Sequence, residues 1–226
     1  EAEAEAEAAG GGAVGWLRLA WACLACGGPE DSVRALLAPV GAAEGLALLP
    51  RLTPADLHPA QQLAWHVRQQ QTGSGARWAE ELLAQGPPSG RGAARAGGRA
   101  GAEAPPEEQL SGLLQHLRVP HVVASPAAVP GGIYRVPIWF PEPRAVLDVD
   151  SQGDRLASGA AGGQAELRRR QLRAAGLQVH TFDASALRGT PRPQQLRALA
   201  EAVALSCPEA EAWLGSPEAL APEGQG

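Results

Sequence analysis

The stretch that decides the fold covers residues 145–187 and reads AVLDVDSQGDRLASGAAGGQAELRRRQLRAAGLQVHTFDASAL. Its first part belongs to the apolar run RAVLDV at 144–149, which predicts a strand that ends in acidic residues. Residues 164–175 predict a helix that ends at Gly176, because glycine favours the position just after a helix. Residues 177–182 then predict a second strand, so the whole stretch predicts an α/β domain.

Further elements of this domain are predicted on both sides of the stretch. They are a helix at 107–117, two strands at 119–123 and 132–140 with Pro-Gly between them, and a final helix at 193–205. We therefore place an α/β domain at 107–207.

The N-terminal part is predicted to be helical over 16–84, where apolar residues recur at helical spacing. Gly-Gly-Pro at 27–29 is a helix stop, and Thr-Pro-Ala-Asp at 53–56 is a helix-start signature. Leu-Ala-Trp occurs at 19–21 and again at 63–65. This recurrence favours a short helical repeat-like segment.

Three segments have the composition of solvated chain rather than of a packed core. Residues 1–15 open with EAEAEAEAAGGG and are predicted to be a low-complexity lead-in. The Gly-, Ala- and Pro-rich residues 85–106 are predicted to be a flexible linker. Residues 208–226 are predicted to be a disordered acidic tail.

Composition excludes several classes of protein. The 226 residues contain no Lys, so Schiff-base chemistry, a P-loop and a Lys-dependent nuclease site are excluded, and a kinase is disfavoured. The absence of Met leads us to expect a mature chain or a fragment. No apolar stretch reaches the roughly 20 residues of a membrane helix, so we expect no membrane partner. A net charge of −5 gives no attraction of the whole chain to nucleic acid, and three cysteines favour a reducing compartment.

The C-terminal half resembles a RAP domain. The motifs that carry this resemblance are the acidic strand Leu-Asp-Val-Asp at 147–150, the Gly-rich turn at 153–163, the helix motif Leu-Arg-Arg-Arg-Gln-Leu at 167–172, and Gly-Leu-Gln-Val at 176–179. The preceding GIYRVPIWFPEP resembles the lead-in strand of that family. Two departures are the run Ser-Gln-Gly-Asp-Arg at 151–155, where the family often has Gly-Pro and then His-Phe, and arginine where the helix usually has Lys.

The N-terminal motifs LAWACLACGG and LTPADLHPAQQLAWHV resemble the helical region that precedes RAP domains in octatricopeptide-repeat and FAST kinase domain-containing proteins. The resemblance implies a fold of class α plus α/β, in which a helical repeat-like segment precedes a restriction-endonuclease-like α/β RAP domain. It also implies an RNA-binding factor of the mitochondrial matrix or the chloroplast stroma. Such a factor acts in RNA processing, mRNA stability, translation or ribosome biogenesis and is not an enzyme.

Two carboxylates raise the alternative of a metal-dependent ribonuclease. Asp148 and Asp150 alternate along the predicted strand, so both point to one face. Gln152 would stand where related nucleases place Lys, which weakens catalysis because no cation then assists the attacking water. In the other interpretation the two acids bind backbone groups or arginines at the strand end. No metal and no cofactor are predicted.

Arginines are the predicted RNA contacts. Arg169, Arg170 and Arg173 share one face of the predicted helix, and Arg168 lies beside them. A solvated helix face is the alternative. Three further candidates, in the linker, could bind RNA through mobile guanidinium groups and are Arg91, Arg95 and Arg99.

The remaining reactive or aromatic residues are interpreted as structural. Cys23 and Cys26 lack the two further ligands of a zinc site and are predicted to be buried thiols. Trp21 and Trp65 are predicted to pack in the core rather than to stack on bases. His180 is predicted to be structural. The third function left open is a protein scaffold in a ribosome or RNA granule.

Overall fold

The computed structural model describes seven α-helices and four strands, within residues 2–38, 40, 52–70, 77–85, 104–125, 133–150 and 161–206. The chain forms two compact units: residues 1–96 with 129–134, and residues 97–128 with 135–226, so that one division falls between residues 96 and 97. That division lies inside the predicted linker 85–106, of which the structure describes only residues 85 and 104–106. The predicted tail 208–226 lies outside the described residues.

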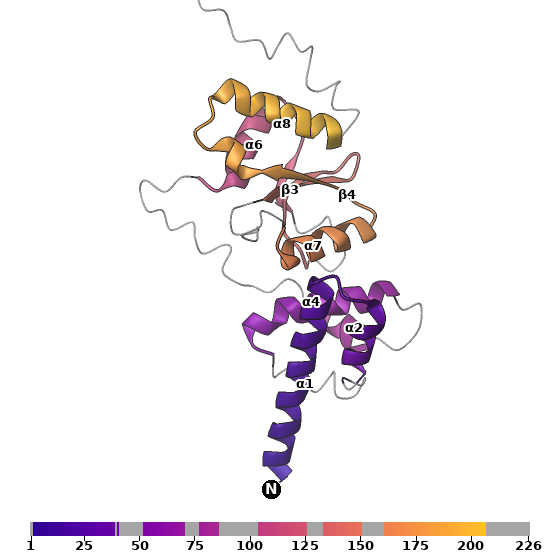
Figure 1. Ribbon diagram of the computed structural model, residues 1–226. Coiled ribbons are helices and arrows are strands. Elements are labelled where there is room, and N and C mark those ends of the chain that lie inside the picture. Colours follow the sequence, from indigo (N-terminus) through magenta and orange to yellow (C-terminus); the bar gives the residue numbers. More distant parts are fainter. Residues whose placement is uncertain are drawn as a thin grey trace, which may run out of the picture. The chain divides into compact units, whose positions relative to one another are not determined.

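The first unit is helical (Figure 1). Helix α1 packs against α2 and α4, and α4 packs against α5. These helices cover Ala2–Ala25 (α1), Glu30–Leu37 (α2), Pro54–Gln70 (α4) and Arg77–Ala84 (α5). The two Leu-Ala-Trp tripeptides are not equivalent in this packing, because Leu19 is half exposed whereas Leu63 is fully buried. The repeat itself stays a prediction.

The second unit is a mixed α/β structure. Its elements, in chain order, are α6 (Pro106–His116), β1 (Val122–Ser125), β2 (Val136–Phe140), β3 (Ala145–Asp150), α7 (Gly163–Ala174), β4 (Gln178–Asp183), the 3-10 helix η5 (Ala184–Leu187) and α8 (Arg192–Ser206). The strands lie in the order β1-β2-β3-β4. The pairs β1–β2 and β2–β3 are antiparallel, whereas β3–β4 is parallel and is connected through α7. The predicted mixed α/β class is therefore confirmed.

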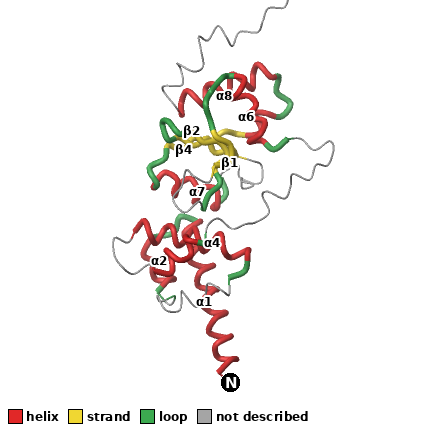
Figure 2. Tube along the Cα trace, turned by 180° about the vertical axis from the view of Figure 1, so that it is seen from behind, coloured by secondary structure: helices red, strands yellow, loops and turns green. Residues whose placement is uncertain are grey.

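Helices cover both faces of this sheet (Figures 1 and 2). Strand β3 lies between β2 and β4, and all six of its residues are buried. Leu147 and Val149 point into an apolar core that also contains Leu114 of α6 and Leu199 of α8. Because side chains alternate along a strand, Asp148 and Asp150 point to the opposite face, which α7 covers.

Three helices end in the same backbone motif, in which the residue after the cap adopts a left-handed conformation. Gly27 after α1 has a φ of 74°, and Gly176 after α7 has a φ of 79°. Both stops are confirmed, since glycine adopts this conformation without steric cost. Helix α6 ends in the same way at Arg118, with a φ of 57°. There Val119 N donates to Leu114 O at 2.9 Å, and Arg118 N donates to Gln115 O at 3.0 Å.

Several predicted boundaries are wrong. Helix α1 begins at Ala2, inside the predicted low-complexity lead-in 1–15, because alanine and glutamate have high helix propensity. The strand predicted at 119–123 begins only at Val122. Tyr134, predicted within the α/β domain, belongs to the helical unit, where its ring meets the ring of His58 edge to face at 5.8 Å.

Candidate functional site

The densest group of charges in the described part of the α/β unit lies between β3 and α7. Strand β3 supplies Asp148 and Asp150, and α7 supplies Arg168 and Arg169. The prediction that both carboxylates share one face is confirmed, because Arg169 contacts both of them. We call these four residues the aspartate–arginine cluster.

The contacts in the cluster are short and interlocked. Arg169 Nε donates to Asp148 Oδ2 at 2.9 Å, and Arg169 Nη2 donates to Asp150 Oδ1. Arg168 Nη2 approaches Asp148 Oδ1 at 2.7 Å. That oxygen accepts no well-aligned hydrogen bond, so Arg168 acts on it mainly through charge. Arg169 is thus a bridge between two carboxylates.

Burial makes this bridge important for stability. The side chain of Asp148 is 0% exposed and that of Arg169 is 6% exposed. Desolvation lowers the pKa of Arg169, but the hydrogen bonds and negative charges of Asp148 and Asp150 outweigh it, so the pKa lies above its ordinary value. Leaving one partner of such a buried pair alone typically costs about 3–5 kcal/mol. The cluster therefore holds α7 on the sheet as a charge-neutralised unit.

The predicted RNA contacts on α7 have three different environments. Arg169 is buried, Arg168 and Arg170 are half-buried, and Arg173 is exposed. Of the four, Arg173 is thus the one that offers its guanidinium most openly to a ligand. The candidates Arg91, Arg95, Arg99 and Gln152 lie outside the described residues.

The expectation that Arg169 shares a solvent-facing surface with Arg170 and Arg173 is wrong. The sheet beneath α7 presents two carboxylates, and these draw Arg169 inward. Helical spacing narrows the choice of inward arginine but does not settle it. Buried Ala165 and Leu172 lie seven residues apart, so Arg168 and Arg169, three and four residues after Ala165, both point the same way as these two. The interpretation in which the acids bind arginines is confirmed by the contacts of Asp148.

Arginines that the sequence did not single out form most of the basic surface. Residues 104–206 contain 11 arginines and nine acidic residues. Among the described residues of this range, three acidic residues are exposed: Glu108, Glu142 and Glu201. Seven arginines there are exposed: Arg118, Arg135, Arg144, Arg173, Arg188, Arg192 and Arg197. This unit therefore has a surplus of exposed positive charge.

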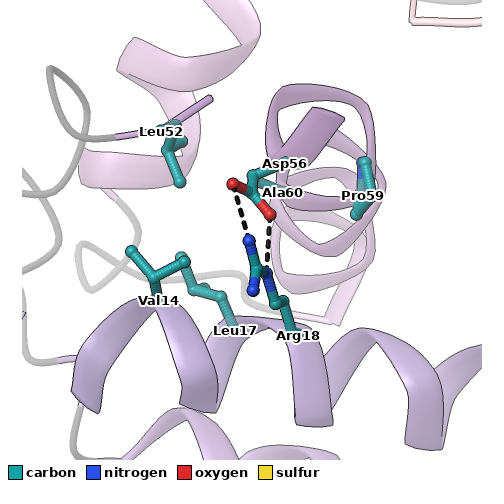
Figure 3. A pocket seen from close by; sticks show the side chains of 7 residues that line it. All are labelled: Val14, Leu17, Arg18, Leu52, Asp56, Pro59 and Ala60. Atoms are coloured by element: carbon teal, nitrogen blue, oxygen red, sulfur yellow. Dashed lines mark hydrogen bonds and ion pairs between the residues drawn. The ribbon is translucent and has the colours of Figure 1, made fainter. Parts of the chain in front are cut away.

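The helical unit contains an ion pair between α1 and the start of α4 (Figure 3). Arg18 Nε and Nη2 donate to the two carboxylate oxygens of Asp56 at 2.7 and 3.2 Å. Thr53 Oγ1 also donates to Asp56, at 2.5 Å. The hydrogen bonds from Arg18 and then from Thr53 lower the pKa of Asp56. The adjoining apolar pocket has space for roughly one water molecule, far below a small-molecule site.

Two histidines of the α/β unit are half-buried. His121 pairs its two ring nitrogens with Ser111 Oγ and Val119 O, both at 2.8 Å. His180 is half-buried on β4, where desolvation and then the charge of Arg173 lower its pKa. Across the residues that the structure describes, no three His, Cys, Asp or Glu side chains gather in a group able to hold a metal ion.

Trp21, Trp65, Cys23 and Cys26 are predicted to be buried, and the structure buries only Trp65 among these four. Trp65 is buried, and half-buried Trp21 donates its Nε1 to Gln62 Oε1 at 2.5 Å. The prediction of buried thiols is wrong. Cys26 is exposed because it follows the last residue of α1, and Cys23 is half-buried.

Comparison with known proteins gives no family for this chain: no protein-family model and no curated protein matches it. No helix in the described ranges has both the length and the apolar character needed to cross a membrane.

Proposed function

We propose that this protein is an RNA-binding factor of organellar gene expression, acting in RNA processing, mRNA stability, translation or ribosome biogenesis. The proposed location is the mitochondrial matrix or the chloroplast stroma. The organellar part rests on the resemblance of residues 132–187 to RAP domains. The mixed sheet with helices on both faces supports the proposed restriction-endonuclease-like α/β fold.

One observation carries the RNA-binding proposal: the exposed positive charge is concentrated in the α/β unit. Seven exposed arginines outnumber three exposed acids among its described residues. The net charge of −5 for the whole chain conceals this difference, because residues 104–206 are net positive. Phosphate groups bind such surfaces through guanidinium contacts and through the release of counterions.

Arg144 and Arg173 are the best candidates for shared phosphate contacts. Arg144 ends the turn before β3, and its carbonyl oxygen accepts a hydrogen bond from Gln178 N at 3.2 Å. Arg173 lies in the last turn of α7, where its carbonyl oxygen accepts from Gly176 N at 2.9 Å. Both backbones therefore lie next to the start of β4, and both side chains are exposed.

The test is fluorescence anisotropy of the full chain with a labelled single-stranded RNA at two salt concentrations. The expected result is binding that weakens as salt rises, because the proposed contacts are to phosphates. The variant Arg144→Asn with Arg173→Gln is expected to bind more weakly; asparagine tolerates the left-handed conformation of Arg144, whose φ is 65°. Absence of binding at low salt would contradict the proposal.

Ribonuclease activity at Asp148 and Asp150 is not favoured. Arg169 already bridges the two carboxylates, so a divalent cation would have to displace a buried guanidinium group. The same RNA samples, incubated with Mg²⁺ and run on a gel, are expected to stay intact. Cleavage that disappears in Asp150→Ala would instead support the nuclease.

An exposed apolar pair on α1 favours a second candidate function, that of a protein scaffold in a ribosome or RNA granule. The side chains of Trp16 and Leu19 are 40% and 55% exposed and lie three residues apart on the helix. Co-sedimentation with ribosomal particles that survives RNase and is lost in Leu19→Glu would favour the scaffold. Loss of co-sedimentation on RNase treatment would favour RNA binding.

A further inference from the structure

Two free thiols lie at the end of α1 and belong neither to the aspartate–arginine cluster nor to the Arg18–Asp56 ion pair. Cys23 is in the last turn of the helix and Cys26 is the first residue after it. Cys26 is exposed, so a small molecule can reach its sulfur. Neither thiol has a role in the proposed RNA surface, which lies in the other unit.

The backbone holds the two cysteines at a separation that a disulfide can bridge. Cys26 N donates to Ala22 O at 2.9 Å, so the helical spacing continues to Cys26. Helix geometry then places the Cα atoms of Cys23 and Cys26 about 5 Å apart. Disulfides join residues whose Cα atoms lie about 4.4–6.8 Å apart.

The Cys23 sulfur already points toward the end of the helix. A Cβ atom placed on Gly28 would overlap Cys23 Sγ, so this sulfur rests against the glycine. Helical side chains usually lean toward the N-terminus, whereas this one leans toward the turn that contains Cys26. At this helical spacing the Cβ atoms lie about 5–6 Å apart, whereas a disulfide holds them about 3.5–4.5 Å apart. Closing the bridge therefore requires the last turn of α1 to tighten as well as rotation about the Cα–Cβ bonds.

We propose that Cys23 and Cys26 form a thiol–disulfide exchange site whose oxidant is a low-molecular-weight disulfide such as glutathione disulfide. The Cys26 thiolate attacks one sulfur of the oxidant, which forms a mixed disulfide and releases one thiol. The Cys23 thiolate then attacks Cys26 Sγ, which closes the Cys23–Cys26 bond and releases the second thiol. Two protein thiols are oxidised, and one small disulfide is reduced to two thiols.

The position in the helix distinguishes this site from that of a disulfide reductase. The pair lies at the carboxyl end of α1, where the helix dipole does not favour an anion. We therefore assign a reversible modification site that responds to the redox poise. The bond would restrain the junction between α1 and α2, which pack against each other.

The test uses the full chain with Cys207→Ser, so that Cys23 and Cys26 are the two remaining cysteines. The folded protein is equilibrated with mixtures of reduced and oxidised glutathione, and its free thiols and intact mass are measured. The expected product has lost both thiols and two hydrogens, has no bound glutathione, and is restored by dithiothreitol. In the same background, Cys23→Ser is expected to keep one glutathione on Cys26, because no resolving thiol is left.

Two results would overturn the inference. One is a stable glutathione adduct on the protein that retains both Cys23 and Cys26, which would show that the ring does not close. The other is retention of both free thiols in the most oxidising mixture. Neither result bears on RNA binding, so the site and the proposed function are tested separately.

Discussion

The two units use the same residue type, arginine, in different ways. In the helical unit, the paired arginines are exposed: Arg18, Arg34 and Arg77 have side chains 65–74% exposed and carboxylate partners within 3.3 Å. In the α/β unit, the paired Arg169 is buried, and the exposed arginines outnumber the exposed acids. The helical unit thus places these exposed arginines in ion pairs, whereas the α/β unit buries a paired arginine and carries a surplus of exposed positive charge.

The largest expected effect comes from breaking the buried pair. Arg169→Met leaves the carboxylates of Asp148 and Asp150 without their bridging cation. The free energy of unfolding is expected to fall by about 3–5 kcal/mol. Urea denaturation followed by circular dichroism measures this change.

A matched variant in the helical unit sharpens that comparison. Arg34→Met removes an equally charged side chain, but its partners Glu30 and Asp31 lie at the surface. Exposed pairs contribute about 0–1 kcal/mol, so little stability should be lost. Similar losses in the two variants would show that burial does not distinguish the two kinds of pair.

The ion pair of Asp56 in the helical unit should make the stability of the protein depend on pH in acid. Because Arg18 and then Thr53 lower the pKa of Asp56 in the folded state, its contribution to stability is present above its ordinary pKa of 3.8. That contribution is lost as the pH falls through the lower pKa of the folded state. Asp56→Asn should lower stability at neutral pH by about 1 kcal/mol, because a buried carboxylate loses its pairing with an exposed arginine, and should flatten the acid dependence. Unfolding curves of both proteins between pH 2 and 7 measure this; equal slopes would refute it.

The helix ends show how much of the fold the sequence could reveal. Gly27 and Gly176 were visible as stops, because glycine is the usual residue in the left-handed position. The same position after α6 is filled by Arg118, which gives no such signal. At the end of α6, Leu114 O and Gln115 O still accept the hydrogen bonds of this motif, although arginine rarely adopts the left-handed conformation.

The candidate site was predictable only in part, for a similar reason. Strand alternation was enough to place Asp148 and Asp150 on one face. Periodicity within the run Arg168–Arg169–Arg170 cannot show which guanidinium turns inward, because that choice depends on the carboxylates of a strand about 20 residues away. Only the tertiary contact between α7 and β3 decides it.

The cap on α6 provides a smaller test. Arg118→Gly relieves the left-handed strain, so the free energy of unfolding is expected to rise by about 0.5–1 kcal/mol. Gly27→Ala in the helical unit is expected to lower the free energy of unfolding by a similar amount, because alanine is strained in the left-handed conformation. Thermal unfolding of both variants checks this; a loss of stability in Arg118→Gly would mean that the arginine side chain stabilises the cap.

The smallest expected effect lies at His180. Burial and then the charge of Arg173 lower its pKa in the folded state below 6.5, so protonation favours the unfolded state. Stability from this residue is therefore complete above pH 6.5 and declines as the pH falls below it. His180→Gln should remove this pH dependence of the free energy of unfolding between pH 5 and 7. A variant that keeps the same pH dependence would assign it to another group.

We propose that exposed arginines of the α/β unit, not arginines in general, bind RNA. The most direct measurement is the slope of log K against log salt for RNA binding by two variants of equal charge change. One is Arg144→Asn with Arg173→Gln, and the other is Arg34→Gln with Arg77→Gln. The slope for the first variant is expected to become shallower by about 1.4, at about 0.7 per lost phosphate contact, while the second variant keeps the wild-type slope. Equal changes in the two variants would contradict it.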